Sequence, residues 1–194
     1  MTEVNPMKFK VIKSFKDVIL DLTTSKPLVI CDIDHTFIRC EFTLQHFKDI
    51  LETDLDKFNS ENEVVLDPTV DDKEAIELMN SAYNMGFVKQ TDPDGFSELL
   101  LNVENMGGKL IFLTARGKDS HKTTLKQLKK AGLKNADKFE IHYTENECTK
   151  GEYIKKNNLL EGYNHFTFMD DYPSYIASVN DLHPQINCYL FRYD

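Results

Sequence analysis

Two pairs of aspartates follow apolar segments of this sequence. Asp32 and Asp34 come at the end of LVICDIDHT, and Asp170 and Asp171 at the end of FTFMDD. An apolar strand that runs into acids is costly unless the acids lie at a solvent-facing end with a positive partner. Residues two apart on an extended chain point the same way, so Asp32 and Asp34 can face one cleft. Because like charges repel, we expect a cation there, and Mg²⁺ prefers such oxygen ligands. Taken alone, each pair could equally cap a turn or a helix.

Two further residues could handle a phosphate group. Thr114 ends the segment KLIFLT, and a hydroxyl at a strand end, near free backbone N–H groups, can hold a phosphate oxygen. Lys150 begins a predicted helix, where a cation opposes the helix dipole and is slightly unfavourable without an anionic partner. The ordinary alternatives are a threonine that caps a turn and a lysine on the surface. All these residues follow strands of one predicted sheet, so we expect them to converge on one crevice.

The elements that must position these residues alternate between strands and helices. Apolar segments of strand length, rich in β-branched or aromatic residues, cover residues 28–33, 109–114, 139–144, 166–170 and 186–191. Helical patterns cover residues 96–106, 120–131, 150–157 and 173–179. This alternation predicts an α/β three-layer sandwich with a parallel sheet and right-handed crossovers.

The connection between the first two predicted strands is longer than one crossover helix needs. Helical patterns at 42–51 and 71–84 precede the one at 96–106, which ends at Gly107–Gly108. We predict a catalytic core of residues 1–37 and 93–194 and a mostly helical insertion of residues 38–92. The insertion emerges at the C-terminal end of the first strand, where open parallel sheets bind ligands. It is either a lid over the site or an elaboration that never touches substrate.

Composition limits the partners of this protein. The net charge of −9 argues against a general affinity for nucleic acid or an anionic membrane. The four cysteines, at 31, 40, 148 and 188, lack the spacing of a metal site and are expected to be reduced thiols. The N-terminal sequence has no apolar run typical of a signal peptide, and the segment at 28–33 is too short to span a bilayer. We therefore expect a cytoplasmic protein.

The motifs, taken in order, resemble those of the haloacid dehalogenase (HAD) superfamily of phosphohydrolases. The resemblance rests on DIDHT at residues 32–36, a strand that ends in Thr114, then Lys150, then a strand that ends in two aspartates. It implies a Rossmann-like sheet with strand order 3-2-1-4-5 and a cap inserted after the first motif. Asp34 narrows the expected reaction, because dehalogenases lack an acid there and transport ATPases carry threonine. An acid at this position favours a phosphatase or phosphotransferase.

The resemblance also implies catalytic roles. Asp32 would be the nucleophile that forms an aspartyl-phosphate. Asp34 would protonate the leaving oxygen and then deprotonate the attacking water. Thr114 would hold the phosphoryl oxygens, and Lys150 would neutralise charge between Asp32 and the phosphate.

A metal site and a further arginine follow from the same resemblance. Mg²⁺ would be bound by a carboxylate oxygen of Asp32, by the backbone carbonyl of Asp34 and by Asp170, with Asp171 supporting it through water. Arg116, in the segment LTARG, resembles part of the TAR segment of some HAD phosphatases. It would contact substrate or orient its loop, and a surface salt bridge is the alternative.

The sequence therefore predicts a Mg²⁺-dependent phosphomonoesterase that acts on a small phosphorylated metabolite. A cap that closes over the site favours small substrates, because it would obstruct a folded protein or a duplex. Two alternatives remain open: a phosphatase of nucleotides or nucleic-acid ends, and a catalytically silent binding protein that keeps the HAD fold. No motif indicates the substrate or the oligomeric state.

Overall fold

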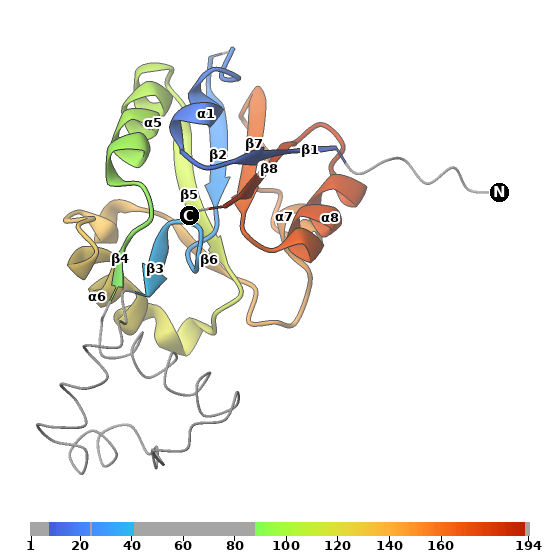
Figure 1. Ribbon diagram of the computed structural model, residues 1–194. Coiled ribbons are helices and arrows are strands. Elements are labelled where there is room, and N and C mark those ends of the chain that lie inside the picture. The colour runs from blue at the N-terminus through green and yellow to red at the C-terminus, as the bar shows by residue number, and fades with distance from the viewer. Residues whose placement is uncertain (1–7, 24, 41–87, 193–194) are drawn as a thin grey trace, which may run out of the picture.

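The computed structural model describes residues 8–23, 25–40 and 88–192. These residues form an α/β structure in which helices cover both faces of a parallel sheet (Figure 1). The helical patterns predicted at 42–51 and 71–84 lie outside the described residues. Among the described helices, none has both the length and the apolar character that crossing a membrane requires.

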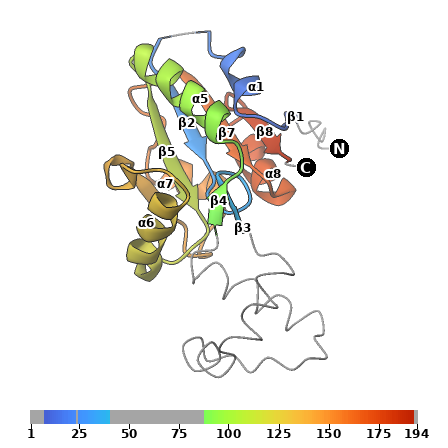
Figure 2. The same cartoon turned by 60° about the vertical axis from the view of Figure 1, so that its left-hand side comes forward.

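The main sheet has six strands, all parallel, in the order β1-β8-β7-β2-β5-β6. The strands are β1 (Phe9–Ile12), β2 (Pro27–Cys31), β5 (Lys109–Thr114), β6 (Ile141–Tyr143), β7 (His165–Asp170) and β8 (Asn187–Phe191). All five predicted strands are present and follow one another as β6-β5-β2-β7-β8, but a sixth strand makes the order of the whole sheet differ from the predicted 3-2-1-4-5. The difference is β1, which pairs with β8 at the edge (Figure 2). Its four residues include three that are exposed, so β1 lacks the apolar run by which the other strands were predicted.

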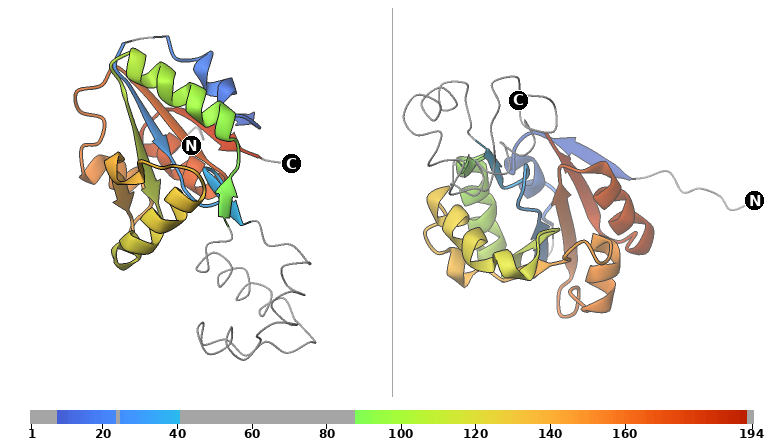
Figure 3. Two further views of the ribbon diagram at one scale, coloured as in Figure 1. Left: turned by 90° about the vertical axis from the view of Figure 1, so that its left-hand side faces the viewer. Right: turned by 90° about the horizontal axis from the view of Figure 1, so that it is seen from below.

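Helices cover the two faces of the sheet with different side chains of each strand. One layer holds α1 (Lys16–Ile19), α5 (Pro93–Asn105) and α6 (His121–Lys130), and the other holds α7 (Lys150–Lys156) and α8 (Pro173–Leu182), as Figure 3 shows. In β2, Val29 and Cys31 pack toward the first layer, and Leu28 and Ile30 toward the second. All five residues of β2 are buried, which is the expected state of a central strand between two helical layers.

The starts of two helices are set by local sequence. Asp92 caps α5 by accepting a hydrogen bond from the backbone N–H of Gly95 (3.0 Å). Thr149 and Glu152 form a capping box at α7: the Thr149 hydroxyl accepts from the Glu152 N–H (3.2 Å), and a Glu152 carboxylate oxygen accepts from the Thr149 N–H (2.8 Å). The box places Lys150 in the first turn of α7.

A second, two-stranded antiparallel sheet joins β3 (Ile38–Cys40) to β4 (Val88–Gln90). Figure 1 shows this pair beyond the arrowhead of β2. The Thr91 hydroxyl donates to the Thr36 carbonyl (2.5 Å), and the Thr91 N–H donates to the Phe37 carbonyl (3.0 Å). Both ends of the predicted insertion 38–92 therefore lie side by side. Strands of only three residues carry too little hydrophobic pattern to be predicted from sequence. The division of the chain into a core and a cap stays a prediction.

Candidate active site

The two aspartate pairs meet because their strands are neighbours. Strand β2 pairs with β7 in a register that places Cys31 opposite Met169. The backbone N–H of Asp32 continues this pairing and donates to the Met169 carbonyl (2.9 Å). Asp32 therefore lies next to Asp170, the last residue of β7, at the carboxyl edge of the sheet.

Three of the predicted acids form a compact group. One carboxylate oxygen from each of Asp32, Asp170 and Asp171 lies within 4.8 Å of the others. Asp32 and Asp170 are buried and Asp171 is half-buried. The pKa of each of these three carboxyl groups is raised, mainly by burial. The pKa of Asp32 is raised to about 7. Clustered carboxylate oxygens are the hard ligands that a divalent cation prefers, so these residues fit such an ion.

Lys150 lies fully buried beside this group. Its ammonium donates a hydrogen bond to Asp32 and another to Asp170, 2.6 Å away. Burial by itself would lower the pKa of Lys150, but the charges of Asp170 and Asp32 outweigh it and raise the pKa. The Tyr175 ring adds a cation–π contact, with its centroid 4.6 Å from Nζ. The lysine therefore stays charged and holds two buried acids together, which agrees with the predicted anionic partner.

Gly151 allows Lys150 to reach this depth. A Cβ atom at position 151 would lie 2.1 Å from the backbone carbonyl oxygen of Ser178 in α8. Helix α7 therefore packs backbone to backbone against α8 at this point, and only glycine permits that approach. His183 reinforces the contact through its Nε2, 2.9 Å from the Gly151 carbonyl oxygen.

Asp34 takes a different partner from Asp32. Strand β2 ends at Cys31, and the chain then turns, with the Phe37 N–H donating to the Ile33 carbonyl (3.0 Å) and His35 at a φ of 59°. The extended geometry that would point Asp32 and Asp34 the same way therefore stops before them. The Asp34 carboxylate is absent from the three-acid group described above, although its charge helps to raise the pKa of Asp32.

Arg116 is the partner of Asp34. Its Nε and Nη2 donate to the two carboxylate oxygens of Asp34 at 2.8 and 2.7 Å. Both residues are among the predicted site residues, but their pairing could not be predicted, because they lie 82 positions apart and neither segment indicates the other. The predicted contact between Arg116 and substrate stays a prediction.

Thr114 lies where the sequence predicts it, buried at the end of β5 beside β2. Its hydroxyl accepts a hydrogen bond from the backbone N–H of Arg116 at 3.3 Å. A cavity of about 430 Å³ adjoins the acid group and is lined by His35, Asp171, Phe191 and Arg192. The acid group therefore borders a space that a small ligand could enter.

Residues 11–157 match the model of a protein family described as "Protein of unknown function (DUF2608)". The match covers more than half of the chain. This protein belongs to the DUF2608 family. No curated protein matches its sequence.

Solved structures show that this DUF2608 protein shares its fold with a phosphatase. The class C acid phosphatase from Bacillus anthracis is similar over 90% of this chain and 72% of that chain, with a TM-score of 0.50 and 14% identity. A putative haloacid dehalogenase-like hydrolase from Burkholderia xenovorans LB400 is similar over 84% of this chain and 83% of that chain, with a TM-score of 0.45 and 10% identity. A chain of the Pnkp1/Rnl/Hen1 RNA repair complex is similar over 100% of this chain and 48% of that chain, with a TM-score of 0.44 and 16% identity. At these identities the likeness concerns the fold alone.

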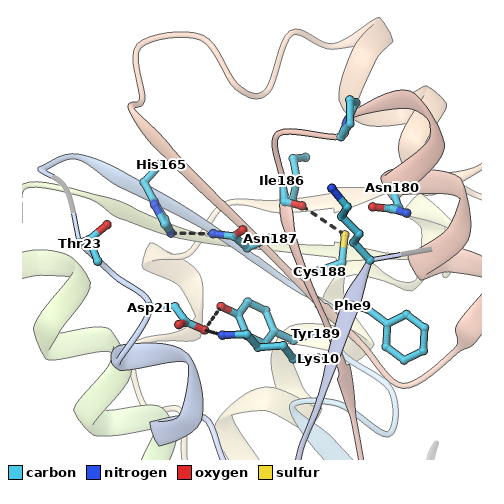
Figure 4. Close-up of a pocket in the computed structure, with 12 residues that line it drawn as sticks. Phe9, Lys10, Asp21, Thr23, His165, Asn180, Ile186, Asn187, Cys188 and Tyr189 are labelled. Carbon is cyan, nitrogen blue, oxygen red and sulfur yellow. Dashed lines mark hydrogen bonds and ion pairs between the residues drawn. The ribbon is translucent and has the colours of Figure 1, made fainter. Parts of the chain in front are cut away.

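A larger cavity of the DUF2608 protein lies away from these acids. It measures about 520 Å³ and borders the first residues of β7 and β8, His165 and Asn187, together with β1 (Figure 4). Its Asp21 accepts hydrogen bonds from Lys10 and Tyr189, both at 2.6 Å. This cavity lies at the amino ends of the strands, and the acid group lies at their carboxyl ends.

Proposed function

We propose that this protein is a Mg²⁺-dependent phosphohydrolase of the HAD superfamily that works through an aspartyl-phosphate. The observation that carries the proposal is the buried group of Asp32, Asp170 and Asp171 with Lys150 donating to Asp32. The fold shared with a class C acid phosphatase supports it. So does the position of the group at the carboxyl edge of a parallel sheet, where such folds bind ligands.

Asp32 is the nucleophile of the proposed reaction. One of its oxygens accepts from Lys150, and the other attacks phosphorus. A bond forms between this oxygen and phosphorus while the bond from phosphorus to the leaving oxygen breaks. Lys150 compensates negative charge on Asp32 and on the phosphoryl group, and the Thr114 hydroxyl holds a phosphoryl oxygen.

Asp34 moves the protons in both halves of the reaction. Its carboxyl group gives a proton to the leaving oxygen in the first step. The carboxylate then takes a proton from water, whose oxygen attacks phosphorus and releases Asp32 and inorganic phosphate. Asp34 suits this work because its side chain is 35% exposed, whereas that of Asp32 is 7% exposed.

The three-acid group is the proposed metal site. Asp32, Asp170 and Asp171 would hold Mg²⁺, together with the backbone carbonyl of Asp34. The ion, when bound, supplies positive charge that offsets the repulsion between a carboxylate nucleophile and an anionic phosphate.

The proposed substrate is a small phosphorylated metabolite. The cavity beside Asp171 has room for a small ligand, which supports this choice of substrate. The net charge of −9 opposes binding of a polynucleotide. We also propose that residues 38–92 form a unit distinct from the core of residues 1–37 and 93–194. Support comes from the β3–β4 pair, which brings the two ends of this segment together.

Phosphate release from p-nitrophenyl phosphate tests the proposal, measured with Mg²⁺ and with EDTA. We expect wild type to need Mg²⁺ and Asp32→Asn to lose all but about a thousandth of the activity. Asp137→Asn is the matched control, because Asp137 is exposed and pairs only with Lys129 among the contacts described for it. A panel of phosphate esters covers the case in which the artificial substrate does not fit. Turnover by Asp32→Asn without metal would contradict the proposal.

A further inference from the structure

A hydrogen-bonded network connects Asp34 to helix α6. Arg116 meets the Asp34 carboxylate with two parallel N–H···O contacts, at 2.8 Å from Nε and 2.7 Å from Nη2. This two-point geometry fixes the plane of the carboxylate as well as its distance, which a single contact cannot do. Lysine offers a point charge and cannot reproduce it.

The guanidinium itself is anchored from the other side. Its Nη1 donates to the Thr124 hydroxyl (2.9 Å) and to the Gln127 side-chain oxygen (2.7 Å). Thr124 and Gln127 lie three positions apart on α6 and thus on one helix face. Their exposed fractions are 0% and 3%, so both polar groups are buried and Arg116 satisfies them.

The two members of the ion pair differ in freedom. The Arg116 side chain is 15% exposed and the Asp34 side chain 35% exposed. The Arg116 backbone is also held at both ends, since its N–H donates to the Thr114 hydroxyl (3.3 Å) and its carbonyl accepts from the Glu145 N–H (3.3 Å). The arginine is therefore the fixed member, and Asp34 is the member that can adjust.

We propose that Arg116 is a positioning residue that orients the Asp34 carboxyl group, with Thr124 and Gln127 setting the orientation of the guanidinium. This inference rests on the proposed function, in which Asp34 moves protons. When Asp34 carries the proton for the leaving oxygen, one oxygen bears that proton and the other remains on Arg116. After the proton has passed to the leaving oxygen, both oxygens again accept from Arg116. The arginine thus acts through Asp34 without contact to the reacting atoms.

Leaving groups of different basicity test the catalytic part of the proposal. An alkyl phosphate needs a proton on its leaving oxygen, whereas p-nitrophenolate departs without one. We expect Arg116→Lys to lower kcat/KM by about 100-fold for an alkyl phosphate and by much less for p-nitrophenyl phosphate. Gln127→Met leaves the arginine in place but removes one of its anchors, and should show a smaller loss of the same kind. An equal loss with both substrates would overturn the proposal.

A double-mutant cycle separates positioning from direct contact with substrate. If Arg116 acts through Asp34, the variant carrying both Arg116→Lys and Asp34→Asn should be no slower than Asp34→Asn alone. Losses that multiply would show that Arg116 contacts substrate independently and would overturn the proposal. Wild type that hydrolyses no ester of a broad panel would overturn the proposed function and, with it, the catalytic role of Arg116.

A measurement that does not depend on catalysis tests the contact between Arg116 and Asp34 directly. The ¹⁵N–¹H signal of the Arg116 Nε–H group can be assigned by its disappearance in Arg116→Lys. We expect this signal to exchange slowly with solvent in wild type and rapidly in Asp34→Ala, which lacks the acceptor. Equal exchange in both proteins would overturn the positioning contact whatever the activity. Thermal unfolding of each variant identifies a change that merely loosens the fold.

Discussion

The Lys150 ammonium lies 2.6 Å from a carboxylate oxygen of Asp170, and both side chains are completely buried. The same ammonium donates to Asp32. One positive charge thus supports two buried acids from neighbouring strands. Removing one member of such a group leaves an uncompensated buried charge.

Lys150→Met should therefore cost both stability and activity. The change keeps the length of the side chain but removes the charge, so Asp32 and Asp170 are left to repel each other. We expect the free energy of unfolding to fall by about 3–5 kcal/mol, measured by urea denaturation, and phosphate release to be lost. Lys155→Met is the control, because Lys155 lies exposed on the same helix. Equal stability of the two variants would show that the buried pair contributes little.

Mg²⁺ should stabilise the wild-type protein through the three-acid group. An ion that binds only the folded state raises the free energy of unfolding by about 2.7 kcal/mol when its concentration is 100 times the dissociation constant. We expect Mg²⁺ to raise the melting temperature of wild type and EDTA to reverse the effect. Asp171→Asn should weaken the response and leave the fold intact, because Asp171 is half-buried. Asp181→Asn, an exposed change on α8, is the control. The same Mg²⁺ response in both variants would exclude Asp171 from the site.

Asp21 should contribute stability that disappears in acid. Hydrogen bonds from Lys10 and then Tyr189 hold the pKa of the Asp21 carboxyl below its usual value. A carboxyl whose pKa is lower in the folded state stabilises the fold above its unfolded pKa of about 3.9, and this contribution is lost as the pH falls through the folded pKa. We expect Asp21→Asn to lower the free energy of unfolding by about 1 kcal/mol at pH 7.

Urea denaturation at several pH values checks this expectation. The difference between wild type and Asp21→Asn should shrink as the pH falls below about 4, because protonated Asp21 resembles asparagine. Asp17→Asn is a control on the same N-terminal segment, since Asp17 accepts only from the backbone N–H groups of Lys13 and Ser14 among its described hydrogen bonds. A difference that stays constant with pH would show that the charge of Asp21 is not what stabilises the fold.

Local pattern was enough to predict most of the described framework. Apolar runs predicted five strands, and β5 has the predicted bounds, 109–114. The helical patterns predicted at 150–157 and 173–179, the second beginning at Pro173, correspond to α7 and α8. These features depend on neighbours within a few positions, so a single sequence carries them. The position of Asp32, Thr114 and Asp170 at strand ends follows from the same local information.

Contacts between distant segments could not be read in this way. The short strand β1 pairs with β8, almost the whole chain away, and its own residues show no apolar run. Strands β3 and β4 are three residues each. Their existence depends on a partner that supplies hydrogen bonds, and pairing across such sequence separations leaves no periodic signal in either segment.

The choice of partners within the site also came from the assembled fold. The sequence indicates that Asp32, Asp34 and Lys150 lie near one edge of the sheet, and the resemblance implies that Arg116 contacts substrate or orients its loop. The register of β2 with β7 and the turn that follows Cys31 decide which acids accept hydrogen bonds from Lys150 and which acid pairs with Arg116. Electrostatic partners are chosen by distance and burial, and both quantities exist only once the strands and helices have packed.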